Sequence, residues 1–237
     1  MDKKFFIAIT SHKGSKFRES QREYLTRDNN GKFIIYYFIG DPSLDKEYVV
    51  DEKNSIVYLR VADNYESLPM KTYGSVKFAL ENFSDQIYGL LKTDDDIELD
   101  LGKIYPYLQE HKEIPYCGIT TKITDPNNLS YWHMGKCESE ELNRTPLKVQ
   151  LAEYCAGGGY YLNLDSMQKI VGSRHMYEGM IFEDASTGHV LNSYGIYPLH
   201  VDLPAKGFNW EGIAPAPPAP PAPPTRASQN VPPGMPV

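Results

Sequence analysis

Short apolar runs alternate with amphipathic segments along the first half of the chain, and this alternation most restricts its fold. We predict buried strands at residues 4–10, 32–39 and 56–61, because each run is rich in β-branched and aromatic residues and stops at polar ones. Helices are predicted over 15–26, where Ser15 can act as cap, and from about Pro69 onward. We therefore expect an α/β fold with a mixed, mostly parallel sheet and helices on both faces.

The second half continues this pattern with less regular spacing. The expected elements are a strand over 87–91, a helix reaching about residue 110, a strand over 116–120, an irregular stretch over 122–150, a turn at Gly157–Gly159, helices over 166–175 and 183–194, and a strand over 196–201.

The end of the chain differs in composition from the rest. Of the 18 prolines among 237 residues, ten follow Ala214, and they are interleaved with alanine. Such repeats favour extended polyproline geometry, which acts as a semi-rigid spacer. We predict one α/β domain over 1–213 and an extended linker or tail over 214–237, leading to further domains of the same chain. An expression remnant or a ligand for a proline-reading module is the lesser alternative.

Charge and apolar content restrict the partners. The formal net charge is −7, and no basic stripe with interleaved aromatic residues occurs, so nucleic acid is not an expected partner. The longest apolar run near the start, Phe5–Ile9, is too short for a signal-peptide core or a membrane span. Cys117, Cys137 and Cys155 lack metal-ligand spacing and are expected to be reduced thiols. We expect a cytoplasmic protein.

An acidic cluster follows the strand predicted at 87–91. Asp94, Asp95 and Asp96 are adjacent like charges that solvent or a cation must compensate. Carboxylate oxygens suit Mg²⁺ or Mn²⁺ held together with substrate phosphates, and ligands of open α/β sheets bind at the carboxyl ends of strands. The alternative is an acidic turn exposed to water.

Two further segments could carry chemistry. Three consecutive glycines in Tyr154–Tyr160 allow backbone to approach a ligand or another segment closely, although a tight turn or bulge explains them equally well. Glu183 and Asp184 at a predicted helix start could supply a general base, but acidic residues also favour helix N-termini for structural reasons. His200 is a possible metal ligand, and a lone histidine is more often structural.

Taken in order, these segments resemble the β-1,3-galactosyltransferase and Fringe-like family of GT-A glycosyltransferases. The matching segments are Arg18–Thr26, Phe38–Gly40, Asp63 to Thr72, Lys92–Asp96 as the DxD motif, Tyr154–Tyr160, and Glu183-Asp184 with Gly188. The compact size and Pro/Ala tail further resemble the N-terminal domain of chlorella-virus multidomain glycosyltransferases that build capsid glycans.

The resemblance implies roles for individual residues. Asp96 would ligate Mn²⁺ (or Mg²⁺), Asp94 would reach the metal through water or face the ribose, and His200 would complete the metal site. Asp184 would be the catalytic base, oriented by Glu183. The expected contacts to the UDP-sugar donor are Thr10, Asp63, Lys71, Asp94, Asp95, Gly158 and Gly159.

The resemblance thus implies metal-dependent, inverting transfer of a hexose or deoxyhexose (glucose, galactose or L-rhamnose) from a UDP-sugar to a glycan acceptor. The acceptor, an oligosaccharide or glycoprotein, is expected to be selected by 122–150, which contains Trp132 and His133. Unlike most family members, the sequence shows no membrane anchor or cysteine pairs, so Golgi residence is not expected. The alternatives are a non-catalytic UDP-sugar- or glycan-binding module, or a divalent-metal phosphohydrolase.

Overall fold

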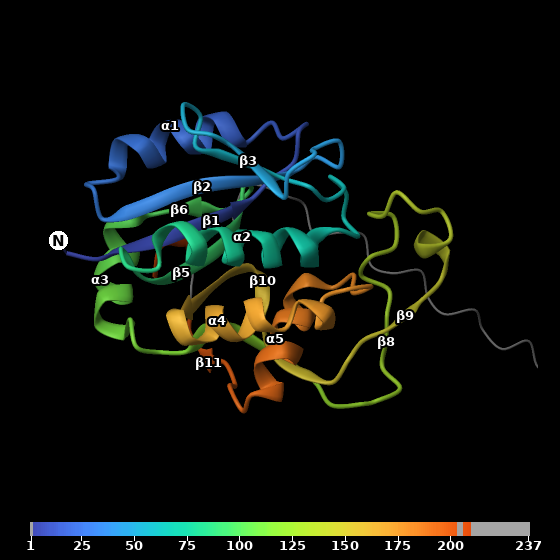
Figure 1. Cartoon of the computed structure of the whole chain (residues 1–237). Helices are drawn as coiled ribbons and strands as arrows, with labels where there is room; N and C mark the ends of the chain where they lie inside the picture. Colours follow the sequence, from blue (N-terminus) through green and yellow to red (C-terminus); the bar gives the residue numbers. More distant parts are fainter. Residues whose placement is uncertain (1, 203–205, 210–237) are drawn as a thin grey trace, which may run out of the picture.

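An eight-stranded sheet forms the centre of the computed structural model, which describes residues 2–202 and 206–209 (Figure 1). Its strand order is β11-β7-β10-β5-β1-β2-β4-β3. The bounds are β1 (Lys4–Thr10), β2 (Phe33–Gly40), β3 (Tyr48–Asp51), β4 (Ile56–Leu59), β5 (Ile87–Asp94), β7 (Tyr116–Ile123), β10 (Ala152–Asn163) and β11 (Leu199–His200).

Strand directions confirm the expected mixed sheet. β1 runs parallel to β2 and β5, β2 to β4, and β7 to β11. β10 is antiparallel to both β5 and β7, and β3 is antiparallel to β4. In the register of β1 and β5, Thr10 lies opposite Asp94, so the ends of these two strands meet at one edge of the sheet.

Helices cover both faces of the sheet, as expected (Figure 1). The helix bounds are α1 (Arg18–Asp28), α2 (Leu68–Phe83), α3 (Leu101–His111), α4 (Leu164–Gly172) and α5 (Glu183–Ser193). Successive β1 residues point to opposite faces: Phe6 and Ala8 pack with α2, α4 and α5, whereas Phe5, Ile7 and Ile9 pack with α1 and α3. This period of two is what a strand buried on both faces requires.

The structure corrects several predicted boundaries. The helix expected from residue 15 begins at Arg18, and Ser15 Oγ accepts the backbone N–H groups of Phe17 and Arg18 ahead of it. The last strand is confined to β11 rather than extending over 196–201. β3 was not predicted, because its apolar stretch Tyr48–Val50 is only three residues long.

The predicted glycine turn is wrong. Gly157–Gly159 lie inside β10, which continues through them to Asn163. The pairing of β10 with β7 is interrupted between Cys155 and Tyr160, where the register shifts. The glycines therefore form an irregular, bulged part of a continuous strand, the alternative that their composition also allowed.

The segment between β7 and β10 forms a lobe at one end of the sheet (Figure 1). Its elements are β8 (Leu129–Ser130), a 3-10 turn (Leu142–Arg144) and β9 (Leu147–Lys148). The Asn64 amide donates to Glu138 (3.1 Å), and the Ser139 N–H donates to Glu66 (3.0 Å). These bonds hold the lobe against the loop that leads into α2.

A second, two-stranded sheet pairs β6 (Glu98–Leu99) with β12 (Phe208–Asn209). The predicted domain end at residue 213 and the tail over 214–237 lie outside the described residues. Among residues that the structure describes, no helix combines the length and apolar character needed to cross a membrane.

Candidate active site

Asp95 ties the ends of β1 and β5 together. Its backbone N–H donates to the Thr10 carbonyl (3.1 Å), and Ser11 Oγ donates to its carboxylate. The side chain is buried, and so is most of Thr10. Both residues were predicted to contact the donor; the structure places them at the sheet edge, with the Asp95 carboxylate already bonded to Ser11.

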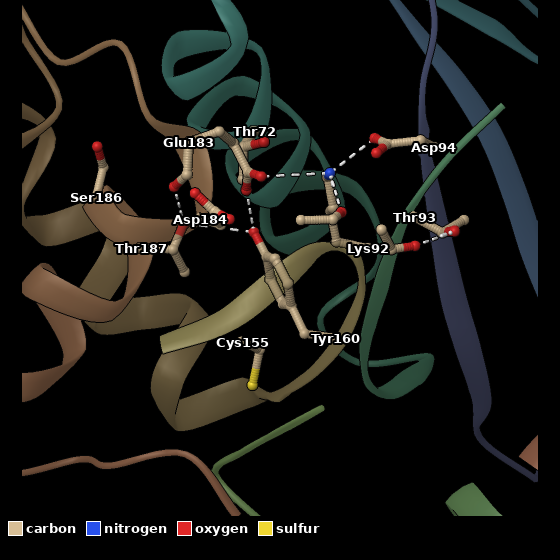
Figure 2. Close-up of polar contacts among 12 residues, drawn as sticks. Thr72, Lys92, Thr93, Asp94, Cys155, Tyr160, Glu183, Asp184, Ser186 and Thr187 are labelled. Atoms are coloured by element: carbon tan, nitrogen blue, oxygen red, sulfur yellow. Dashed lines mark hydrogen bonds and ion pairs between the residues drawn. The ribbon is translucent and has the colours of Figure 1, made fainter. Parts of the chain in front are cut away.

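Lys92 is a buried cation at the centre of the site. Its ammonium lies 2.8 Å from Asp94 Oδ1, 3.3 Å from Glu183 Oε2 and 2.6 Å from the Gly157 carbonyl (Figure 2). Burial alone would lower the pKa of Lys92, but the two carboxylates outweigh it and raise the pKa. The lysine therefore stays charged and joins three segments: the acidic cluster, β10 and the start of α5.

Glu183 is nearly inaccessible to solvent. The Tyr160 hydroxyl donates to its Oε1, and Lys92 lies at Oε2. Burial raises the pKa of Glu183, Lys92 lowers it, and Asp184 raises it further. The hydrogen bonds of this carboxylate go to Tyr160 and Lys92, so its contact with Asp184 is electrostatic. We predicted that Glu183 orients Asp184; the structure gives it a bridging position between β10 and β5.

Asp184 is the second residue of α5, and backbone N–H groups hold its carboxylate. Ala185 N–H donates to its Oδ1 (2.8 Å), and Gly157 N–H also donates to the carboxylate. Burial raises its pKa, and these bonds and Lys92 offset only part of the rise. A Cβ at position 157 would lie 3.3 Å from Glu183 Oε2 and 3.8 Å from Asp184 Oδ2. Glycine therefore lets β10 approach both carboxylates closely.

The predicted metal ligands are not gathered into one cluster. Within residues 2–202 and 206–209, no group of three or more His, Cys, Asp or Glu side chains could hold a metal ion. His200 lies on β11 with Nδ1 3.1 Å from Thr120 Oγ1. Asp94 and Asp96 remain as neighbouring carboxylates, and burial and the charges of Asp94 and Asp95 raise the pKa of Asp96.

This donor set fits one mode of divalent-metal binding. Mg²⁺-like ions are often held by one or two carboxylates, with substrate phosphates and water completing the coordination. Asp94 and Asp96 supply those two carboxylates, and a cation would relieve the repulsion that raises the pKa of Asp96. The residues therefore fit a metal that arrives with a diphosphate, but not a cage built from protein alone.

Asp63 and Lys71 brace the loops at the same edge. Lys71 Nζ lies 2.6 Å from Asp63 Oδ1 and donates to the Ser11 carbonyl (3.2 Å). Asp63 also accepts the N–H groups of Gly40 and Lys13. Burial works to raise the pKa of Asp63, yet these bonds lower it overall. Both residues were predicted to bind the donor; their charged groups connect the β1, β2 and α2 ends.

Gly158 and Gly159 face neighbouring strands. The Gly158 carbonyl accepts a bond from Thr93 Oγ1 (2.9 Å), and Gly159 pairs with Thr93 in the β5–β10 register. A Cβ at Gly118 would lie 2.9 Å from the Gly159 carbonyl oxygen. Gly158 and Gly159, which were predicted to contact the UDP-sugar, thus pack against neighbouring strands, and their backbone carbonyls face groups within the sheet.

Sequence reasoning gave no role to Lys92 or Tyr160, which the structure places between the acidic cluster and Glu183. A signal was available for Lys92, because it directly follows Leu90-Leu91 at the end of an apolar run predicted as a buried strand. A charge there needs a buried partner of opposite sign. The residues that neighbour Lys92 in the sequence do not show which residue that partner is.

The fold and the site define an α/β protein with acidic groups gathered at the carboxyl edge of its sheet. Residues 17–202 match the family model described as galactosyltransferase. The chain therefore belongs to the galactosyltransferase family, which confirms the resemblance drawn from its motifs.

Curated relatives include UDP-GalNAc:beta-1,3-N-acetylgalactosaminyltransferase 1 of Mus musculus and of Homo sapiens, 26% and 27% identical over 152 residues. Each alignment covers 63% of this chain and 44% of the relative, so the chain spans less than half the length of these relatives. A solved structure, 4-diphosphocytidyl-2C-methyl-D-erythritol synthase from Anaerococcus prevotii, aligns with a TM-score of 0.43, 10% identity, and coverage of 89% and 92% of the two chains.

Proposed function

We propose that this domain transfers a hexose or deoxyhexose from a UDP-sugar to a hydroxyl of a glycan, with inversion at the anomeric carbon. The observation that carries this proposal is the position of Asp184, a half-buried carboxylate with a raised pKa that also lines a pocket. Membership of the galactosyltransferase family supports the reaction class. The relatives named above carry UDP-GalNAc in their names, so that donor joins UDP-glucose, UDP-galactose and UDP-L-rhamnose as a candidate.

In the proposed reaction, the acceptor oxygen attacks the anomeric carbon while its proton passes to the Asp184 carboxylate. The bond from that carbon to the diphosphate oxygen breaks, and UDP leaves with the electron pair. A raised pKa makes Asp184 a stronger base than an exposed aspartate. A divalent cation bound at Asp94 and Asp96 would supply charge stabilisation to the leaving diphosphate.

Ligand-dependent thermal unfolding tests the donor site. A ligand at one hundred times its dissociation constant adds about 2.7 kcal/mol of stability. We expect a rise in Tm with UDP and Mn²⁺ together and little rise with either alone. No rise in any condition would contradict the donor assignment and leave a glycan-binding module as the better interpretation.

Transfer is then measured as UDP release, with the four UDP-sugars as donors and a mixed oligosaccharide acceptor. Asp184→Asn should retain Mn²⁺-dependent UDP binding and lose transfer, because the amide cannot accept the acceptor proton. Retained transfer in this variant would remove Asp184 from the proposed mechanism. The cytoplasmic location, the role in viral capsid glycans and the connection to further domains remain predictions from sequence.

A further inference from the structure

A pocket of about 290 Å³ lies beside Asp184, between β7, β10, the start of α5 and the lobe that contains β8 and β9. Asp184 is part of its wall, so a ligand in this pocket lies against the proposed base. The pocket wall is mixed in character. Ile123, Val149 and Phe182 contribute apolar side chains, and Thr121, Asn128 and Ser130 contribute hydroxyl and amide groups.

We infer that this pocket binds the acceptor as a single neutral pyranose ring, with Trp132 as the surface on which the ring packs. The inference rests on the proposed transfer reaction, since it assigns the acceptor to the side of the site where Asp184 can take its proton. A pyranose has apolar C–H faces and a rim of hydroxyls, which matches a wall that combines apolar side chains with uncharged hydroxyl and amide groups.

The charge of the pocket favours a neutral sugar. Asp184 is its one ionisable acidic wall residue in the described part of the chain, and neither lysine nor arginine lines it there. A uronate or phosphate on the acceptor would be repelled by Asp184, and Lys136, which lies against the ring of Trp132, is not itself part of the wall. Neutral hydroxyls, in contrast, can bond to Thr121, Asn128 and Ser130.

Trp132 is suited to contact a ligand because its ring is both exposed and held in place. It is 60% exposed, the largest exposed fraction among the bulky apolar side chains described. Lys136 Nζ lies 3.7 Å from the centroid of its ring. The neighbouring His133 is fully buried, with Nε2 2.9 Å from the Leu142 carbonyl and its ring 5.5 Å from that of Phe182. Trp132 therefore projects from a rigid support attached to the start of α5.

Direct binding of simple glycosides tests this inference independently of transfer. Saturation-transfer NMR is recorded with the methyl glycosides of glucose, galactose and N-acetylglucosamine, and with methyl glucuronide, in the presence of UDP and Mn²⁺. We expect at least one neutral glycoside to bind, and the glucuronide to bind at least tenfold more weakly. Failure of every neutral glycoside to bind, or preference for the glucuronide, would overturn the inference.

Variants identify the binding surface. Trp132→Ala should weaken glycoside binding by about tenfold, the effect of losing one well-placed aromatic contact, and Trp132→Phe should recover part of it. Tyr197→Ala is the matched control, because Tyr197 is similarly exposed and lines none of the described pockets. Glycoside affinity within twofold of wild type in Trp132→Ala would also overturn the inference.

The two proposals fail in different ways. Trp132-dependent glycoside binding without any UDP release would support the acceptor pocket and contradict the transfer reaction. Transfer that proceeds with an unchanged acceptor KM in Trp132→Ala would support the reaction and contradict the pocket. UDP-dependent thermal stabilisation should be equal in wild type, Trp132→Ala and Tyr197→Ala, since the proposal assigns neither side chain to donor binding.

Discussion

The ammonium of Lys92 and the carboxylate of Glu183 form a buried ion pair, 3.3 Å apart, between β5 and the first residue of α5. The same ammonium lies 2.8 Å from Asp94. One side chain thus links the proposed donor side of the site to the helix that carries the proposed base. The buried ion pair holds the donor side of the site and the start of α5 in a defined relative position, because breaking a buried ion pair is energetically costly.

Replacement of Lys92 should destabilise the protein strongly. In Lys92→Met the Glu183 carboxylate stays buried without its cation, and such losses cost about 3–5 kcal/mol. Because Glu183→Gln removes the stranded charge, the double variant Lys92→Met/Glu183→Gln should be less destabilised than the sum of the two single variants. Urea unfolding of the four proteins measures this coupling. A loss below about 1 kcal/mol in Lys92→Met would show that the pair contributes little.

Asp184→Asn should increase stability at neutral pH. Burial raises the folded-state pKa of Asp184 above its ordinary value of 3.8. A raised pKa contributes stability that is present below the unfolded-state pKa and lost as pH rises through the folded-state pKa. At neutral pH the ionised group therefore costs stability, and the amide removes this cost.

The difference in Tm between Asp184→Asn and wild type should shrink as the pH is lowered toward 3.8. Thermal unfolding across this pH range measures it. A variant that is less stable than wild type at neutral pH would indicate that the hydrogen bonds from Ala185 and Gly157 outweigh the burial of the charge. In the active protein, transfer should fall on the acidic side at a higher pH than an exposed aspartate would give.

Asp96→Ala should abolish the dependence of UDP binding on Mn²⁺, because Asp96 is a proposed metal ligand. Titration calorimetry of UDP with and without Mn²⁺ measures this. Asp85→Ala is the control: Asp85 is exposed and precedes β5, at the opposite end of that strand from the acidic cluster. Unchanged Mn²⁺ dependence in Asp96→Ala would show that the cluster is an acidic turn and not a metal site.

Gly188→Ala should destabilise the packing of α5 on β10. A Cβ at this position would collide with the side chain of Tyr154 and lie 2.7 Å from the Glu153 carbonyl oxygen. Overpacking of this kind costs about 1–3 kcal/mol. Gly172→Ala in α4 is the control, because its Cβ would meet no atom within 4 Å. Chemical denaturation of both variants compares them, and equal stabilities would contradict the close approach of α5 to β10.

Local patterns predicted most of the fold correctly. The buried strands β1 and β2 and the start of α2 were recognisable because period, β-branching and Pro69 are properties of neighbouring residues. The prediction of a glycine turn was wrong because it, too, considered only residues that are neighbours in the chain. Gly157–Gly159 permit a turn, but Gly159 pairs with β5 and the residues on either side of the glycines pair with β7, and these strands, distant in sequence, keep the glycines in β10.

The motifs identified a set of candidate site residues, whose roles stay predictions, but did not predict how these residues are arranged. Asp94, Asp184 and their neighbours were recognised from motifs, yet His200 is not gathered with the acidic cluster in the described structure. Lys71 and Asp63 form a brace that no spacing rule reveals.

The sequence by itself determined the alternation of strands and helices, the acidic end of β5 and the carboxylates that begin α5, because each depends on residues adjacent in the chain. The tertiary structure decided that Lys92 joins Asp94 to Glu183 and that the lobe carrying Trp132 borders Asp184. These relationships arise from the pairing of β10 between β5 and β7, since long-range strand order determines which distant side chains share one edge of a sheet.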